Sequence, residues 1–201
     1  MSNALSRKRK KMQPIGYKEE VHVFNQQAVR RLNYAKELGD KTFSDTKLIA
    51  YQILHDKFGF GLKRIERLGS GVEAILQKKV PYLKLVDYLG AEKEIDLSDV
   101  DVPQRELLAF QNVPYNNYIL PLQNKINVIA GAVSDYIVLS VVVLKEQFKF
   151  SKNQIMVYVG WICYYINSLA TGYETMLGVA SVLACECKYY DPRFIGKTYE
   201  V

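Results

Sequence analysis

The sequence predicts an all-α protein made of two pseudo-repeated helical units that pack together. Apolar residues recur at spacings of three and four along most of the chain, which is the period of an amphipathic helix. The apolar pattern of the first half also returns 90 residues later, after a stretch rich in Pro, Asn and Tyr. We therefore expect four parts: a disordered basic tail (1–16), a first helical unit (17–96), an irregular linker with a short helix (97–125) and a second helical unit (126–201).

Positive charge is concentrated in the first half of the chain. The net charge is +6, and residues 1–100 carry all of the excess, since Lys and Arg balance Asp and Glu in residues 101–201. Adjacent cations repel one another and rarely pack, which predicts disorder at the run Arg7, Lys8, Arg9, Lys10 and Lys11. Such a run is a solvated tail, a nuclear localisation signal or an arm that neutralises phosphates. Only phosphate binding would weaken steeply with salt.

The first unit is predicted to open with two helices. One begins at Tyr17 and carries an apolar stripe at Val21, Phe24, Ala28, Leu32 and Ala35. Gly39 is a natural stop, because glycine adopts the left-handed conformation that ends many helices. The second helix then starts at Thr42 or Ser44, whose hydroxyl can cap an unpaired backbone N–H, and it runs to Lys57.

A turn and two further helices complete the first unit. Phe58-Gly59-Phe60-Gly61 predicts a tight turn anchored in the core by its aromatic rings. A third helix follows over 62–76, in which Gly69 and Gly71 indicate either a close helix crossing or a break. A short fourth helix is expected over 83–89, and Pro103 suits the first position of the short helix in the linker.

The second unit is interpreted as a degenerate copy of the first. Residues 54–61 align with 144–151, and the match in apolar pattern extends without a gap from Leu48 opposite Val138 to Leu76 opposite Ile166. The copy makes 137–144 a buried helix, although its β-branched residues also suit a strand. It also makes 153–173, an uncharged stretch long enough to span a bilayer, a core or dimer helix.

Residues able to support catalysis or bind metal are few. Cys163, Cys185 and Cys187 lack the spacing of a zinc site and are interpreted as buried, reduced thiols of a cytosolic protein. No nucleophile motif or phosphate loop is present, so we expect no catalytic residue, metal or cofactor. A distant alternative is a metal-dependent phosphohydrolase, because His22 followed by His55-Asp56 has the order of an H…HD site, which needs a further aspartate.

The block LHDKFGFGLKRIER, residues 54–67, resembles a motif in uncharacterised proteins of phages and prophages of Gram-positive bacteria. The resemblance covers residues 44–96, and the second copy departs from it at Lys149 and Ser151. It brings no established chemistry. What it implies is a phage or mobile-element origin, a bacterial cytoplasm, and a role in phage regulation or in opposing a host defence.

Elimination leaves a binding protein that acts without catalysis. A basic surface is expected where the N-terminal run joins Lys57, Lys63, Arg64 and Arg67, and it would engage nucleic acid or a nucleic-acid-bound complex. The alternative is a protein-directed inhibitor of a bacterial defence system that uses the apolar second half. Four tyrosines would stack on bases, fill that interface or form half-buried core: Tyr115, Tyr118, Tyr189 and Tyr190. We expect no membrane, and a homodimer is an open alternative.

Overall fold

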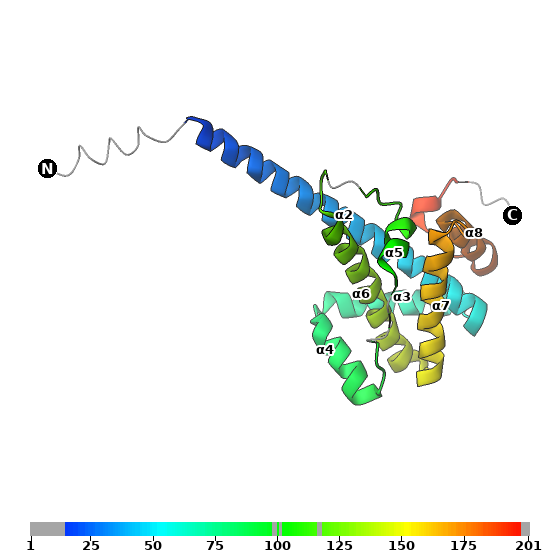
Figure 1. Cartoon of the computed structure of the whole chain (residues 1–201). Helices are drawn as coiled ribbons and strands as arrows, with labels where there is room; N and C mark the ends of the chain where they lie inside the picture. The colour runs from blue at the N-terminus through cyan, green and yellow to red at the C-terminus, as the bar shows by residue number, and fades with distance from the viewer. Residues whose placement is uncertain (1–14, 98–99, 101, 116–117, 198–201) are drawn as a thin grey trace.

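The structure is a computed structural model that describes residues 15–97, 100, 102–115 and 118–197, with side chains from residue 25 onward. The described residues form helices and no strand, which confirms the predicted fold class (Figure 1). The described residues contain seven α-helices, a π-helical turn after α4 and a 3-10 turn after α8. They are α2 (Ile15–Phe58), α3 (Leu62–Gln77), α4 (Tyr82–Asp87), η1 (Tyr88–Glu92), α5 (Gln104–Phe110), α6 (Leu122–Phe148), α7 (Lys152–Ala170), α8 (Met176–Cys187) and η2 (Pro192–Phe194).

The predicted repeat is present in the backbone. Gly59 after α2 and Lys149 after α6 both adopt the left-handed conformation, with φ of 64° and 58°. In each copy the backbone N–H of the second phenylalanine of the F-x-F turn donates a hydrogen bond to the carbonyl six residues earlier. Phe60 N–H reaches Leu54 at 3.0 Å, and the equivalent bond of the second copy measures 3.1 Å. A glycine and a lysine thus end the two long helices with the same turn.

Two pairs of rings show that the copies are related by a pseudo-two-fold axis. Phe58 lies on Phe150, and Phe60 lies on Phe148, each pair with centroids 4.9 Å apart and planes at 41°. The halves interleave about this axis. Helix α2 contacts α6, α7 and α8, and α6 contacts α3 and α4 in return. Each long helix is therefore covered by the shorter helices of the other half.

The helix break predicted at Gly39 does not occur, because α2 runs unbroken through this residue. A side chain at Gly39 would meet Val128 of α6 at 3.6 Å, so the glycine lies in the helix contact rather than at a helix end. Thr42 does not cap a new helix, since its hydroxyl donates to the carbonyl of Leu38 at 2.7 Å. The burial of the following turns offsets the roughly 1 kcal/mol that a mid-helix glycine costs. Ser44 is likewise internal to α2.

The glycines of α3 mark a close helix crossing and not a break. A Cβ atom at Gly71 would lie 2.7 Å from Val143 of α6, and one at Gly69 would lie 2.5 Å from the Tyr51 hydroxyl. Both distances are shorter than any ordinary carbon contact. Glycine at these positions lets α3 approach α6 and α2 while the helix continues to Gln77.

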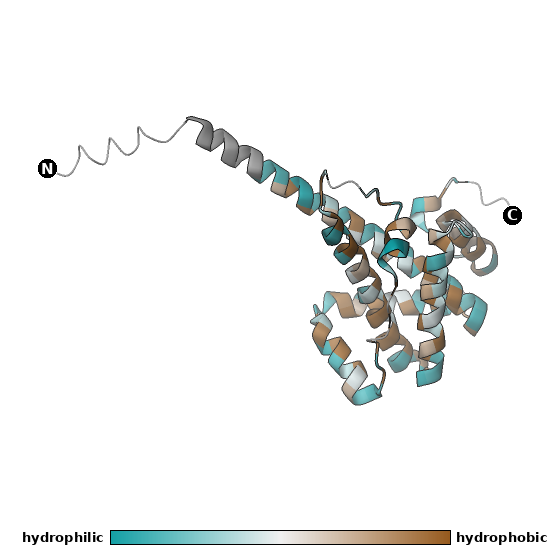
Figure 2. Ribbon diagram, viewed as in Figure 1, coloured by the Kyte–Doolittle hydropathy of each residue, from teal (hydrophilic) through white to brown (hydrophobic). Residues whose placement is uncertain are grey.

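The first part of α2 projects from the helical body as a single rod (Figure 1). We call residues 15–36 the projecting helix. The predicted apolar stripe is uncovered there: Ala28 is exposed and Leu32 is 71 % exposed, and apolar and polar residues share its surface (Figure 2). The same helix becomes buried from Leu38 onward. Residues 1–14, most of the predicted disordered tail, lie outside the described residues, whereas Ile15 and Gly16 belong to α2.

The two apolar segments of the second half are both helices of the packed body. Residues 137–144 are all buried within α6, which confirms the prediction of a buried helix over a strand. In the part of the chain that the structure describes, α6 is the one helix long and apolar enough to cross a membrane, and 61 % of its most apolar stretch is buried by other helices. Helix α7, in the predicted core segment, packs Ile155, Ile162 and Ile166 with no exposed surface.

Candidate functional site

The four basic residues predicted near the first turn are exposed, but three of them lie over aromatic rings. The Lys57 ammonium is 4.0 Å from the centroid of Trp161, and the guanidinium groups of Arg64 and Arg67 lie 5.4 Å from Phe60 and 5.2 Å from Phe148. Such contacts contribute about 0.5–1 kcal/mol each at exposed sites. Lys63 is exposed beside them. These cations cover the aromatic turn as well as facing solvent.

The N-terminal run cannot join these residues in one basic face of a single chain. Ile15 and Lys57 belong to one helix and are 42 positions apart, which is about 63 Å along its axis. Residues 7–11 lie outside the described residues, at most eight positions before Ile15, and eight residues span at most about 28 Å when extended. The unbroken α2 therefore separates the two clusters that were predicted to form one basic surface.

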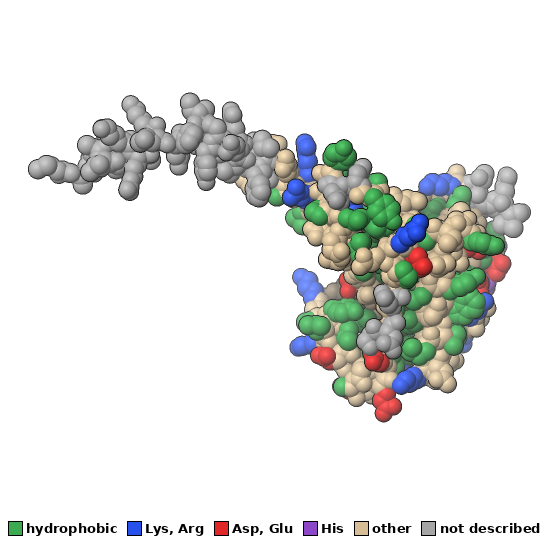
Figure 3. Space-filling view, in the orientation of Figure 1, with side chains coloured by type: hydrophobic (Ala, Val, Ile, Leu, Met, Phe, Trp, Pro, Cys, Tyr) green, Lys and Arg blue, Asp and Glu red, His purple; other side chains and the backbone are tan. Residues whose placement is uncertain are grey.

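Positive charge instead accumulates toward the N-terminal end of α2. Without the run at 7–11 the chain has 22 Lys and Arg against 21 Asp and Glu, so that run supplies nearly all of the net charge. The projecting helix adds exposed Arg30, Arg31 and Lys36, and cationic side chains gather where it meets the body (Figure 3). Sequence alone does not single out Arg30 and Arg31, because only the structure shows that both are exposed on this segment, where Arg31 lies near Leu120 and Asn124.

The four predicted tyrosines differ in accessibility. Tyr115, Tyr118 and Tyr190 are exposed, Tyr118 by 90 %. Tyr189 packs its ring edge-on against Tyr51, with centroids 5.1 Å apart, and burial raises the pKa of its hydroxyl to about 12. Tyr189 is therefore a partly buried residue that packs against the core, whereas the other three are exposed to solvent.

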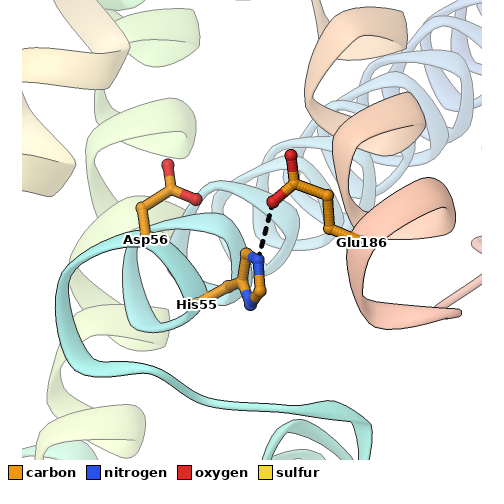
Figure 4. A group of neighbouring side chains, drawn as sticks. All are labelled: His55, Asp56 and Glu186. Carbon is orange, nitrogen blue, oxygen red and sulfur yellow. Dashed lines mark hydrogen bonds and ion pairs between the residues drawn. The ribbon is translucent and has the colours of Figure 1, made fainter. Parts of the chain in front are cut away.

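A cluster at the end of α2 combines His55, Asp56 and Glu186, whose possible ligand atoms lie within 4.8 Å of one another (Figure 4). His55 Nδ1–H donates to the carbonyl of Phe60 at 3.0 Å, and Nε2 lies 2.8 Å from the Glu186 carboxylate of α8. Asp56 accepts a hydrogen bond from Tyr165 at 3.1 Å. Both ring nitrogens of His55 thus face an acceptor, an arrangement that suits a protonated imidazole.

The repeat favours a structural role for this histidine over a metal site. The equivalent residue of the second copy is Lys145, whose ammonium donates to the Phe150 carbonyl at 3.3 Å, in the same way that His55 binds Phe60. In both copies the side chain at this position therefore donates to the carbonyl of the second phenylalanine and stabilises the turn. His22 lies 33 positions earlier in the same helix, about 50 Å away, so His22 and His55 of one chain cannot share an ion.

The ion pair predicts a pH-dependent contribution to stability. Burial alone would lower the pKa of His55, but its hydrogen bonds to Phe60 and Glu186 outweigh burial and raise it. The stabilisation is therefore complete below the unfolded-state pKa of histidine and is lost as pH rises through the raised folded-state pKa. We expect His55→Gln to lower the free energy of unfolding at pH 5.5 by less than about 1 kcal/mol, because the pair is partly exposed, and by less still at pH 8.5.

Urea unfolding of the wild type and the variant at both pH values measures this difference. An effect that is equal at the two pH values would contradict the charged pair. Bound metal that is lost in His55→Ala would instead revive the hydrolase alternative.

The cysteines do not form a common site. Cys187 is buried, as predicted, and Cys163 is partly buried. Cys185 is exposed, which corrects the prediction of three buried thiols. Positions 185 and 187 are two apart in α8 and so point to different sides of the helix. No disulfide joins the three, all of which lie in the described part of the chain.

Comparison of the chain with protein-family models, with curated proteins and with solved structures finds no match. Three surfaces are candidates for function. They are the basic run at 7–11 with the projecting helix, the exposed tyrosines, and the aromatic turn with its covering cations.

Proposed function

We propose that the protein is a non-catalytic nucleic-acid-binding protein of a phage or mobile element that acts in the bacterial cytoplasm. The observation that carries the proposal is the placement of charge. Nearly all of the excess positive charge precedes a long helix that projects from the body and exposes Arg30 and Arg31.

This placement suits phosphate binding because the contacts need no complementary cavity in the body. Lys and Arg that neutralise backbone phosphates release condensed counterions, and that release supplies most sequence-independent affinity. A helix about 1 nm wide also fits the major groove of a DNA duplex. The body beyond residue 36 is close to neutral, so it adds little attraction of its own.

Salt dependence of binding tests the proposal. The variant with Gln at all of positions 7–11 is expected to lose most of its affinity for a short DNA duplex or RNA strand. The magnitude of the slope of log affinity against log salt is expected to fall by about four to five for the duplex and by about three to four for the single strand. Fluorescence anisotropy at several salt concentrations measures both quantities. Arg30→Gln/Arg31→Gln should remove a further part of the slope.

Lys149→Gln/Lys152→Gln provides the matched control, because both lysines are exposed at the turn between α6 and α7 and belong neither to the projecting helix nor to the predicted basic residues. It removes the same charge as the arginine pair and should leave the slope unchanged. Equal losses in the control and in the arginine variant would mean that net charge acts without a site. Wild-type protein that binds neither DNA nor RNA at low salt would refute the proposal.

A second candidate function is protein-directed inhibition of a bacterial defence system. It is supported by the exposure of Tyr115, Tyr118 and Tyr190, since tyrosines that are accessible on a monomer commonly anchor protein interfaces. Pull-down from bacterial lysate with and without nuclease separates the two candidates. Salt-insensitive co-purification of a host protein that Tyr118→Ala abolishes would favour inhibition.

A further inference from the structure

A groove of about 600 Å³ lies between α2, α3, α4 and α6 and shares only Lys36 with the projecting helix. Its rim includes three exposed apolar side chains, Leu76, Val80 and Tyr82. Charge enters it at only three positions: Lys36 and Asp40 from α2, and Asp135 from α6. The remaining lining is apolar or uncharged, so the groove offers apolar contacts beside a net negative charge.

The α6 wall of this groove is the repeat equivalent of a covered face of α2. Asp135 follows Asp45 by 90 residues, and each follows a serine. Asp135 is accessible to solvent, whereas Asp45 is 2 % exposed. The same holds for the apolar neighbours: Val128 lines the groove, but its equivalent Leu38 is buried. One face of the repeated helix is thus closed in the first copy and open in the second.

Two segments without a counterpart in the other half close the face on α2. Gln111, which follows α5, donates to Asp45 at 3.3 Å. Arg193 of η2 donates to the same carboxylate at 2.6 Å and to the Ser44 carbonyl at 3.2 Å. Next to Arg193 in sequence, Phe194 packs on the core. The segments that cover this face of α2 therefore place an arginine against Asp45 and an aromatic side chain in the core beside it.

Among the described residues, Asp135 has no cationic partner equivalent to the Arg193 that pairs with Asp45. Burial by the groove walls raises the pKa of its carboxyl group. Tyr82 faces it from α4, and no described residue donates a hydrogen bond or ion pair to it. Lys36 and Asp40, the other charged groups of the groove, offset each other in sign. A guanidinium group would supply the missing partner.

We propose that this groove binds a peptide segment of a partner protein in which an arginine is flanked by apolar or aromatic residues. The arginine would pair with Asp135, and its neighbours would lie on Leu76, Val80 and Tyr82. The chain's own C-terminal segment is already held on Asp45 by Arg193, so the peptide comes from another protein. Such a site is independent of phosphate binding by the N-terminal end of α2.

Nuclear magnetic resonance of the isotope-labelled full chain tests the proposal with a defined probe. The probe is a synthetic peptide with the sequence of residues 188–197, KYYDPRFIGK, which carries the arginine and aromatic residues of the covered copy. It is expected to shift the amide signals of Leu76, Val80, Gly131 and Asp135. The same peptide with Gln in place of its arginine should bind at least about tenfold more weakly, as loss of a hydrogen-bonded charge implies.

Asp135→Asn should weaken binding of the arginine peptide to a similar degree. Asp87→Asn is the control, because it makes the same change at an exposed position of α4 outside the groove, and it should not weaken binding.

Three results would overturn the proposal. They are shifts confined to Ser44 and Asp45, no shift at millimolar peptide, and a peptide-independent dimer that Asp135→Asn dissociates. The last result would identify a second copy of the chain as the occupant.

Discussion

Asp45→Asn is expected to lower the free energy of unfolding by about 3 kcal/mol, whereas Asp135→Asn changes it by less than about 0.5 kcal/mol. The Asp45 carboxylate is buried and accepts from three groups: Arg193 at 2.6 Å, Lys41 at 3.1 Å and Gln111 at 3.3 Å. An amide in its place would turn a donor toward these donors and leave them unsatisfied. Asp135 has no such partner to lose.

Urea unfolding of both variants at pH 7 measures the two changes in free energy of unfolding. The slope of each transition should match that of the wild type, as two-state behaviour requires. The two substitutions are chemically identical and occupy equivalent positions of the repeat, so each serves as the control for the other. Equal losses of stability would mean that Asp135 is paired in solution, and the open groove would then be occupied or closed.

Phe60→Ala is expected to destabilise the fold by about 4 kcal/mol, which is the second large effect. Phe60 is 2 % exposed and contacts both Phe148 and Phe150 at the pseudo-two-fold axis. Truncation removes a buried ring and leaves a cavity that the constrained turn cannot fill. Phe58→Ala should cost less, because Phe58 is only partly buried.

A double-mutant cycle on Phe60 and Phe148 separates the ring contact from burial. The coupling free energy between the two substitutions is expected to be about 0.5–1.5 kcal/mol. The symmetric pair, Phe58 and Phe150, has the same separation and tilt and should give a similar value. Two clearly different couplings would contradict the symmetry of the turns.

Sequence periodicity predicted the helices that bury one face, and the repeat correctly assigned the β-branched stretch of α6. Those predictions succeed because helical period and burial are both local properties of the sequence. The predicted end at Gly39 failed for a tertiary reason. Whether a glycine ends a helix or admits a close neighbour depends on α6, which is more than 80 residues away in sequence.

The candidate surfaces were predictable only in part. Tyr115 and Tyr118 are exposed, as an interface would need, but Tyr189 is adjacent to the exposed Tyr190 in sequence and is half-buried against Tyr51. The groove at Asp135 could not be predicted, because it depends on which segments cover each copy. A signal was nevertheless present in the sequence, since Ser-Asp occurs at both 44–45 and 134–135.

The interleaving of the halves governs the order in which the chain can reach its native state. The apolar face of α2 is covered by α6, α7 and α8, all of which are synthesised after the linker. During translation the first half therefore leaves the ribosome with much of its core face exposed. Packing against this face is complete only after α6, α7 and α8 have been synthesised. Contacts between such distant segments slow folding and prolong exposure to aggregation.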